Sequence, residues 1–383
     1  MSDKSNRSEN TLHIFAVFLC ISVDFDLIYS QEKFRPVLLL RKFAEGQGQS
    51  AGEFYTPKEV GWLMADLLDP RPLTTIHDPA CGSGGLLLKP RLRFEQKHPE
   101  QKGQAPRLYG QELNPTTFAM AKMNMFLHDF TDAVIAIGDT LRTPRFVASG
   151  AGLQRFDYVI ANPMWNQKNY GPEFYDGDKL DRFSAGQPPA NTADWAWVQH
   201  MLAALNATGC AAIVLDTGAI SRGSGSKNSD KEKEIRAALV EADVIEGVVL
   251  LPENLFYNTT APGIVLLLNR AKPAPRKGQF ILINASQYFR KEKPKNVLTD
   301  EGIAAAGAYH AWETRPKLSR VVTLEEVRKA DYNLSPSQFV EVGDRATHRD
   351  LADILADLRA AREERERADA ALAEMLVKLG MEA

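Results

Sequence analysis

A glycine-rich loop and three separated acidic residues carry the first signs of chemistry in this 383-residue chain. The loop, residues 78–85, reads DPACGSGG and lies between an apolar run and a helical pattern. Glycines at such a turn let the backbone approach a ligand closely, with amides exposed at the helix start. Phosphate-binding loops need no acid at their first position. The acid here, Asp78, therefore favours a cationic nucleoside without phosphates over a dinucleotide or ATP.

The three acids have distinct uses at such a site. Asp78 can accept hydrogen bonds from an ammonium group, and Glu112 can accept both ribose hydroxyls, as carboxylates do in doubly wound folds. Asp139 closes a third apolar run, where its carboxylate would reach an adenine amino group. Each acid alone is more typical of a helix cap or a turn. Three acids at successive strand ends favour the nucleoside site.

A second motif, Asn162-Pro163-Met164-Trp165, follows the apolar run 156–161 and suits chemistry on an exocyclic amine. The Asn162 side-chain carbonyl and the Pro163 backbone carbonyl can both accept from such an amine. Those bonds favour the positive charge that develops as the nitrogen attacks a sulfonium methyl group. Trp165 can stack on a base held out of a nucleic-acid helix. By itself an Asn-Pro pair is more typical of a turn.

Alternating strands and helices must position these residues. Strands are predicted at 74–78, 107–112, 133–139, 156–162, 210–216, 244–251 and 264–269, with helices at 115–128, 194–205 and 231–241. Near-continuous apolar strands that alternate with helices are typical of a parallel, doubly wound α/β sheet. Ligands bind such sheets at the carboxyl ends of the strands. The acids and Asn162 are therefore expected at one edge.

The motifs together resemble a known family. The chain is similar to the amino-methyltransferases whose signature is Asn-Pro-Pro-aromatic, and in particular to the modification subunits of type I restriction–modification systems. The resemblance covers about residues 40–340 and is carried, in family order, by GEFYTP (52–57), DPACGSGG (78–85), YGQELNP (109–115), GDTL (138–141), FDYVIANP (156–163) and the segments 193–202, 233–270 and 323–336.

The resemblance implies a Rossmann-like methyltransferase with a C-terminal helical or coiled-coil tail. It implies S-adenosylmethionine as cofactor, no metal, and site-specific methylation of DNA at N6 of a flipped adenine. Carried over residue by residue, it implies catalytic roles for Asn162, Pro163 and Trp165, and cofactor contacts from Glu53, Phe54, Tyr55, Thr56, Pro57, Lys58, Asp78, Gly82, Ser83, Gly84, Gly85, Glu112 and Asp139.

Two features depart from the family pattern. Met164 stands where the family has its second proline, and Trp165 stands where it usually has phenylalanine. Family members also carry a sizeable helical domain before the GEFYTP segment, so residues 1–45 are interpreted as its atypical short remnant. Two other functions therefore stay open: a catalytically inactive, truncated scaffold subunit, and an RNA or protein-glutamine methyltransferase that shares the Asn-Pro-x-aromatic loop.

The charge balance indicates that partners are needed. Lysine and arginine total 46 against 49 acidic residues, whereas a protein that grips DNA alone usually has a basic surplus. Apart from the tail, the chain after Asn269 is too short for a domain that reads base edges. The resemblance implies double-stranded DNA, a separate specificity subunit, a restriction subunit in the full complex and a second modification subunit as partners.

The C-terminal tail has a heptad pattern. Its apolar positions alternate in steps of three and four, at Leu351, Ile354, Leu358, Ala361, Ala368, Leu372, Met375 and Leu379. Such a seam predicts a long helix that pairs with the specificity subunit, with a helix folded back on its own domain as the alternative. The predicted parts are a short N-terminal segment (1–45), a catalytic domain (46–290), an extension (291–345) and the heptad helix (346–383).

The cysteines and the apolar N-terminal run bear on the compartment. Cys20, Cys81 and Cys210 lack the spacing of a disulfide framework or a zinc site, which suits a reducing cytoplasm. The run at 12–23 is shorter than the roughly 20 residues of a membrane span. A cytoplasmic protein with no membrane association is the expectation.

Overall fold

The structure, a computed structural model, describes residues 56–149, 152–168, 170–257, 259–342 and 359–370. The chain forms two compact units, residues 1–342 and residues 343–383. The predictions for segment 1–45 and for Glu53, Phe54 and Tyr55 lie outside the described residues.

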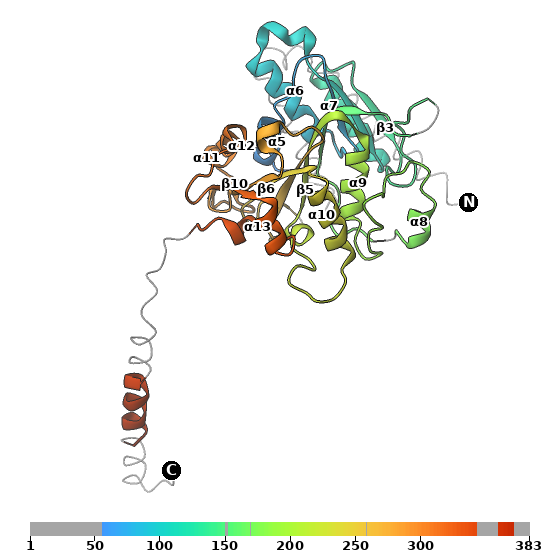
Figure 1. Cartoon of the computed structure of the whole chain (residues 1–383). Coiled ribbons are helices and arrows are strands. Elements are labelled where there is room, and N and C mark those ends of the chain that lie inside the picture. Colours follow the sequence, from blue (N-terminus) through green and yellow to red (C-terminus); the bar gives the residue numbers. More distant parts are fainter. Residues whose placement is uncertain (1–55, 150–151, 169, 258, 343–358, 371–383) are drawn as a thin grey trace, which may run out of the picture. The chain divides into compact units, whose positions relative to one another are not determined.

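A mixed sheet runs through the first unit (Figure 1). Within the described residues it has nine strands, in the order β11-β8-β6-β7-β5-β4-β1-β2-β3. These strands are β1 (Thr75–Asp78), β2 (Arg107–Glu112), β3 (Val134–Ile137), β4 (Phe156–Ala161), β5 (Leu205–Asp216), β6 (Ile245–Leu250), β7 (Gly263–Asn269), β8 (Gln279–Asn284) and β11 (Ser319–Thr323). A separate two-stranded ribbon joins β9 (Phe289–Arg290) to β10 (Val297–Leu298).

Helices connect the strands and cover the sheet. The described α-helices of this unit are α5 (Lys58–Leu68), α6 (Gly85–Lys97), α7 (Pro115–Leu127), α8 (Pro172–Asp176), α9 (Asp194–Ala204), α10 (Lys231–Glu241), α11 (Asp300–Ala304), α12 (Ala306–Ala311), α13 (Leu324–Lys329) and α14 (Pro336–Phe339). Short 3₁₀ turns lie at η1 (Pro99–Gln104), η2 (Thr217–Ile220) and η3 (Ala274–Arg276).

Alternate residues of the buried strands point to opposite faces, as the period of two in a strand requires. In β5, for example, Ala212 and Val214 pack in one core with α5, α6 and α7, whereas Ala211, Ile213 and Leu215 pack in another with α9 and α10. The two cores give the doubly wound α/β fold that the sequence predicts, with helices on both faces of the sheet (Figure 1).

The expectation of a wholly parallel sheet is wrong at two strands. β7 runs antiparallel to both β5 and β6, and β11 runs antiparallel to β8. A parallel connection needs a crossover of a dozen or more residues, usually through a helix. The described residues between β6 and β7 form no helix, and the chain turns back to fill the space between β5 and β6.

Local signals account for most of the element ends. Asn114 caps α7, because its side-chain oxygen accepts from the amides of Thr116 and Thr117. Asp230 caps α10 in the same way through the amide of Lys233. β2 and α10 have the predicted bounds, but β5 begins at Leu205, five residues before the predicted start.

The second unit is described only at residues 359–370, which form one exposed helix. Ala361 and Ala368 of the predicted heptad seam lie in this helix, and the other six seam positions lie outside the described residues. Pairing of this helix with another chain stays a prediction.

Two further findings concern the described part of the chain. Cys81 and Cys210 are both free thiols. None of the described helices has both the length and the apolar character needed to cross a bilayer.

Candidate ligand-binding and catalytic site

The strand order brings the predicted site residues to one edge of the sheet. β1 pairs in parallel with β2 on one side and with β4 on the other, and β3 follows β2. The chain thus reverses its strand order at β1, the point where ligands bind in open α/β sheets. The segments after these four strands are those that contain the glycine loop, Glu112, Asp139 and Asn162.

One large cavity, of about 1180 Å³, opens at this edge. Nine of the sequence-predicted residues line it: Thr56, Lys58, Asp78, Gly82, Ser83, Gly85, Glu112, Asp139 and Asn162. Four other predicted residues are described but lie outside the lining: Pro57, Gly84, Pro163 and Trp165. The cavity therefore joins the predicted cofactor loop to the predicted catalytic asparagine.

The glycine loop has a shape that side chains would prevent. Gly84 caps α6 with a φ of 79°, and a Cβ atom there would lie 2.6 Å from Cε of Met125 on α7. Gly82 also has a positive φ, of 54°. Only glycine adopts this backbone readily, so α6 can begin close to α7, and its first residues, Gly85 and Leu86, line the cavity.

Glu112 fastens this loop to the end of β2. Its Oε2 accepts from the Gly82 amide at 3.0 Å, and its Oε1 accepts from the Asn114 amide at 2.8 Å. Each carboxylate oxygen has a second lone pair. Glu112 can therefore hold the loop and still accept hydrogen bonds from a ligand in the cavity.

Asp78 is a buried acid without a positive partner among the described side chains. It is 1% exposed, and its Oδ1 accepts from the Ala80 amide at 3.0 Å. Burial, aided by the nearby Glu112 carboxylate, raises the pKa of Asp78 to about 8. Burial also raises the pKa of Glu112. A cationic ligand would stabilise the ionised form of both carboxylates.

Asp139 lies at the third strand end, next to Arg142. Its Oδ1 accepts from the Arg142 amide at 3.0 Å, and its Oδ2 lies 3.7 Å from the guanidinium. The following residue, Thr140, donates its hydroxyl to the Pro79 carbonyl at 2.5 Å. That bond ties the loop after β3 to the loop after β1.

The predicted catalytic loop is oriented by hydrogen bonds at its first residue. The Asn162 amide nitrogen donates to Thr56 Oγ1 at 3.0 Å, and the Trp165 indole N–H donates to Asn162 Oδ1 at 3.1 Å. The two bonds fix which way the amide faces, and they leave one lone pair of Oδ1 for another donor.

Trp165 packs away from the cavity lining. Its ring lies edge-on to Phe256 at 4.8 Å between centroids, and a Cβ at Gly263 would lie 3.0 Å from the indole. Glycine at that position therefore makes room for the large ring. Met164 is 53% exposed, and stacking of Trp165 on a base stays a prediction.

Several lining residues were missed by the sequence analysis. Leu113, 61% exposed, directly follows Glu112, and its apolar side chain at a polar strand end was an available signal. Trp62 on α5 lies beside Lys89 of α6, with the ammonium 4.8 Å from the ring centroid. No sequence signal links these two, because only the packing of α5 on α6 brings them together. Of two tryptophans on α9, Trp195 lies in the core and Trp197 lines the cavity.

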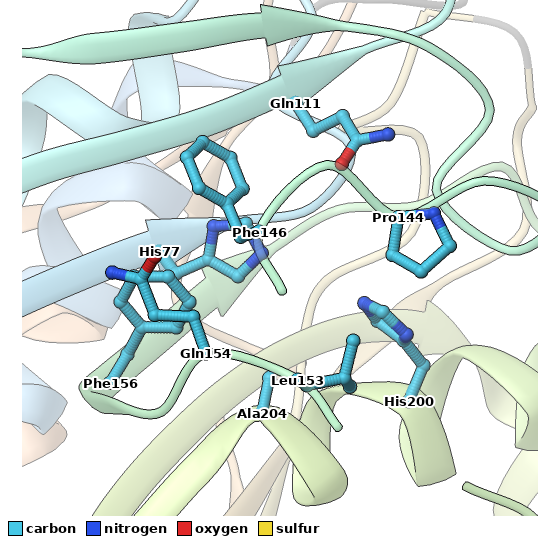
Figure 2. A pocket seen from close by; sticks show the side chains of 9 residues that line it. All are labelled: His77, Gln111, Pro144, Phe146, Leu153, Gln154, Phe156, His200 and Ala204. Carbon is cyan, nitrogen blue, oxygen red and sulfur yellow. The ribbon is translucent and has the colours of Figure 1, made fainter. Parts of the chain in front are cut away.

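His77 of β1 and Phe156 of β4 belong to an aromatic cluster that also includes Phe146 (Figure 2). His77 stacks on Phe156 at 4.4 Å between centroids and meets Phe146 edge-on at 5.2 Å. The imidazole Nδ1 donates to the Tyr109 carbonyl at 3.1 Å. Burial lowers the pKa of His77 to about 4, so the ring is neutral at physiological pH.

His77 should make the stability of the protein depend on pH. Its folded pKa, about 4, lies below the unfolded value of about 6.5, so its contribution is full above pH 6.5 and lost as the pH falls towards 4. Over that range we expect roughly 3 kcal/mol of lost stability from this residue. Urea unfolding of the parent and of His77→Phe at several pH values measures the difference. A difference that is constant with pH would contradict the assignment.

Comparisons with known proteins find similar proteins over most of the chain. A family model described as N-6 DNA methylase matches residues 37–348. The methylase subunit of the type I restriction enzyme MjaVIII from Methanocaldococcus jannaschii is 42% identical over 318 residues, covering 80% of this chain and 53% of the relative. The HindI methylase subunit from Haemophilus influenzae is 33% identical over 310 residues, covering 79% and 66%.

A solved structure gives the same result for the fold. The methyltransferase subunit of a type I restriction–modification system from Streptococcus thermophilus superposes with a TM-score of 0.66 at 32% identity, covering 76% of this chain and 60% of that chain. The chain spans 53% and 57% of the lengths of the first two curated relatives, or about half.

Proposed function

The chain belongs to the N-6 DNA methylase family, and on that premise we propose that it transfers a methyl group from S-adenosylmethionine to N6 of a flipped adenine in DNA. We propose further that it does so as the modification subunit of a type I restriction–modification complex. The observation that carries the proposal is the single cavity that joins Asp78 and Glu112 to Asn162.

The size of the cavity fits two ligands side by side. Sites for one drug-sized ligand measure about 300–1,000 Å³, and this cavity measures about 1180 Å³. A methyl transfer needs a donor and an acceptor in one space, within reach of each other. The cavity supplies that space between the glycine loop and the catalytic loop.

The acids fit S-adenosylmethionine. A buried carboxylate with no cationic partner in the described structure, as at Asp78, suits the ammonium group of an amino acid. Glu112 would accept from the ribose hydroxyls through its remaining lone pairs, and Asp139 from the adenine amino group. When bound, the cofactor supplies the sulfonium methyl group. Thr56 and Lys58 line the same cavity, and Glu53, Phe54 and Tyr55 belong to the segment just before them.

Asn162 and Pro163 would act on the base. The free lone pair of Asn162 Oδ1 and the Pro163 backbone carbonyl accept from the two N–H bonds of the adenine amine. Fixed acceptors stabilise the positive charge that the nitrogen gains during transfer, and they need not reorganise. No strong base is required, because the proton is lost after the nitrogen has become cationic. Trp165 would stack on the flipped adenine after it leaves the contact with Phe256.

The partners follow from the same premise. The chain has a net charge of −3, so we propose that a specificity subunit, bound through the heptad helix, supplies most of the DNA contact. A second modification subunit and a restriction subunit would complete the complex, in the cytoplasm.

The other two functions receive less support. A scaffold without activity has no use for an asparagine and three acids along one cavity edge. The family model names DNA methylation, and the curated relatives described here are subunits of restriction enzymes rather than RNA or protein methyltransferases.

A transfer assay tests the proposal. The full chain is co-expressed with the specificity subunit of its own system and incubated with labelled S-adenosylmethionine and DNA that lacks adenine methylation. We expect N6-methyladenine after nuclease digestion and mass spectrometry, and none when the specificity subunit is omitted. Label on cytosine, on RNA or on protein would overturn the substrate assignment. Cofactor binding without any transfer would favour the scaffold.

A further inference from the structure

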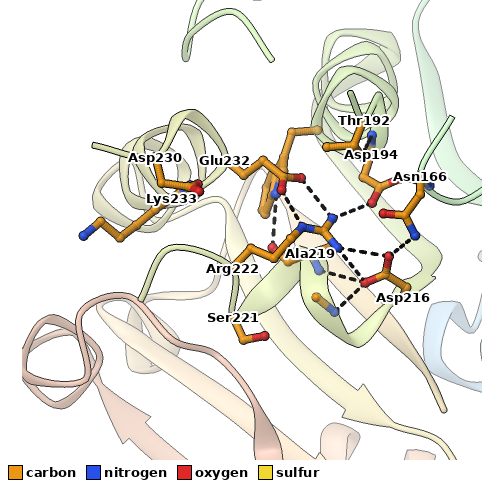
Figure 3. A network of polar contacts seen from close by, with 12 residues as sticks. Asn166, Thr192, Asp194, Asp216, Ala219, Ser221, Arg222, Asp230, Glu232 and Lys233 are labelled. Atoms are coloured by element: carbon orange, nitrogen blue, oxygen red, sulfur yellow. Dashed lines mark hydrogen bonds and ion pairs between the residues drawn. The ribbon is translucent and has the colours of Figure 1, made fainter. Parts of the chain in front are cut away.

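A charge cluster with two buried acids, Asp194 and Glu232, lies beside the catalytic loop and contacts neither the glycine loop nor the three cavity acids. Figure 3 shows its centre, the Arg222 guanidinium, surrounded by three carboxylates. We propose that this cluster is a clamp that fixes the far end of the catalytic loop, and that Arg222 and Asn166 are positioning residues for methyl transfer. This inference rests on the proposed function for its kinetic consequence only.

The clamp binds the catalytic loop through hydrogen bonds to Asn166. The backbone amide of Asn166 donates to Asp194 Oδ1 at 2.8 Å, and its side-chain nitrogen donates to Asp216 Oδ2 at 2.5 Å. Asn166 has a φ of 53°, a left-handed conformation that asparagine tolerates better than most residues. The loop therefore ends in a turn that two carboxylates hold from outside.

Arg222 makes those carboxylates into fixed acceptors. Its Nη2 donates to Asp194 at 2.7 Å, and its Nη1 donates to both oxygens of Asp216, at 3.0 and 3.1 Å. Its Nε donates to Glu232 of α10 at 2.5 Å. Asp194 is fully buried, so its charge depends on this partner. The planar fork of arginine suits three acceptors in a way that the single ammonium of lysine cannot.

The clamp is itself held by the fold. The buried Arg236 of α10 donates to the backbone carbonyls of Arg222 and Ala219, and Trp195 donates its indole N–H to Ala219 as well. Asp194 begins α9 and Asp216 ends β5, the strand that pairs in parallel with β4. The catalytic loop is thus fixed at one end by β4 and at the other by α9, β5 and α10.

The sequence of the loop explains why an external clamp matters. Asn162 and Pro163 must present two carbonyls to one amine, and an error of about 1 Å in such a geometry can cost about 100-fold in rate. Met164 leaves the backbone free to rotate where a proline would fix φ. Its amide donates to no described residue, so proline at this position would remove no bond seen in the structure. The clamp supplies from outside the rigidity that the loop itself lacks.

Two substitutions release the clamp in different ways. Asn166→Asp keeps the turn but places a carboxylate against Asp216. Arg222→Lys keeps one positive charge but cannot reach all three acceptors. We expect each to lower kcat by about 10- to 100-fold while the Kd for S-adenosylmethionine stays within twofold. The double variant should lose little more than the worse single variant, because the two residues act as one unit.

Matched controls exist elsewhere in the chain. Asn206 and Asp157 lie near the first residues of β5 and β4, at the edge of the sheet away from the catalytic loop. The Asn206 side-chain nitrogen donates to Asp157 at 2.7 Å, so Asn206→Asp places two carboxylates together far from the loop. Arg328 contacts Glu241 through two nitrogens at the surface, so Arg328→Lys matches the arginine change. Both controls should keep kcat within twofold of the parent.

Repeating the substitution in a second variant distinguishes an effect on loop rigidity from a general loss of structure. In Met164→Pro protein the proline itself restricts the loop backbone. The fold-reduction in kcat caused by Asn166→Asp should therefore be at most one fifth of the fold-reduction that the same substitution causes in the parent. Equal factors in both backgrounds would show that Asn166 does not act through loop rigidity. Values of kcat within twofold of the parent for both clamp variants would also overturn the proposal.

Hydrogen–deuterium exchange tests the clamp without any assay of activity. The amide of Asn166 is bonded to a buried carboxylate, so the peptide that spans 163–168 should be protected in the parent and exchange at least tenfold faster in Arg222→Lys and Asn166→Asp. It should be unchanged in Asn206→Asp. Equal exchange in parent and clamp variants would overturn the clamp. Faster exchange in a protein that never methylates DNA would uphold it and contradict the proposed function alone.

Discussion

Replacing Asn162 with alanine is expected to lower the rate of methyl transfer by about 10²- to 10³-fold and to leave cofactor affinity within twofold of the parent. The side chain supplies one of the two proposed carbonyl acceptors, and its amide is already oriented by the hydrogen bond that it donates to Thr56 Oγ1 at 3.0 Å. Loss of a pre-oriented group that acts on developing charge affects kcat more than binding. Single-turnover kinetics with saturating DNA, together with calorimetric titration of S-adenosylmethionine, measures both quantities.

Asn284 offers a matched control for that experiment. It also ends a buried strand, β8, and its side-chain oxygen accepts from the Ser286 amide at 3.1 Å. Because Asn284 does not line the cavity, Asn284→Ala should cost stability without a comparable loss of rate. Transfer by Asn162→Ala within tenfold of the parent would show that Asn162 is not the main acceptor.

Replacing Asp78 with asparagine is expected to weaken binding of S-adenosylmethionine by about 100-fold or more. The carboxylate is 1% exposed, and removing one partner of a buried charge pair costs about 2–5 kcal/mol. Asp181→Asn is a suitable control, since Asp181 is exposed and its φ of 52° is one that asparagine also adopts. Calorimetry should give the control an unchanged Kd. Equal losses in both variants would contradict a specific role for Asp78.

The pKa of Asp78 predicts how the affinity for S-adenosylmethionine changes with pH. Its pKa in the free protein is about 8, and a bound ammonium favours the ionised form, so binding below pH 8 must release a proton. Affinity should therefore rise by up to about tenfold per pH unit as the pH approaches about 8. The folding stability of the free protein should change in the opposite direction. Because the pKa of Asp78 in the folded protein lies above the unfolded value of about 3.9, its contribution to stability is lost as the pH rises towards 8.

Titrations in buffers of different ionisation enthalpy count that proton directly. We expect about one proton released per cofactor at pH 7 in the parent, and a loss of that release in Asp78→Asn. An affinity that does not change between pH 6.5 and pH 8 would contradict a buried, protonated Asp78.

Local sequence decided the elements that hold the predicted site. The glycine loop, the strand ends at Glu112 and Asn162, and the capped helices at Asn114 and Asp230 depend on neighbours within a few residues. Apolar periodicity, glycine φ preferences and side-chain caps act over such distances, so they can be read from the chain alone. The resemblance to the family added residues such as Thr56 and Lys58, and the strand order brought nine of the thirteen predicted site residues that the structure describes to one cavity.

Tertiary structure decided what the sequence pattern could not. β7 runs antiparallel to its neighbours, and the described residues that lead into it form no crossover helix. The sequence could not reveal this, because the period of an apolar strand is the same in either direction. Trp165 faces Phe256 because Gly263, about 100 positions later in the chain, leaves room for its ring. Arg222 reaches Asp194, Asp216 and Glu232 only after β5, α9 and α10 have packed. Contacts between residues far apart in sequence follow from how the elements pack, so motifs determined the chemistry of this protein and packing determined its geometry.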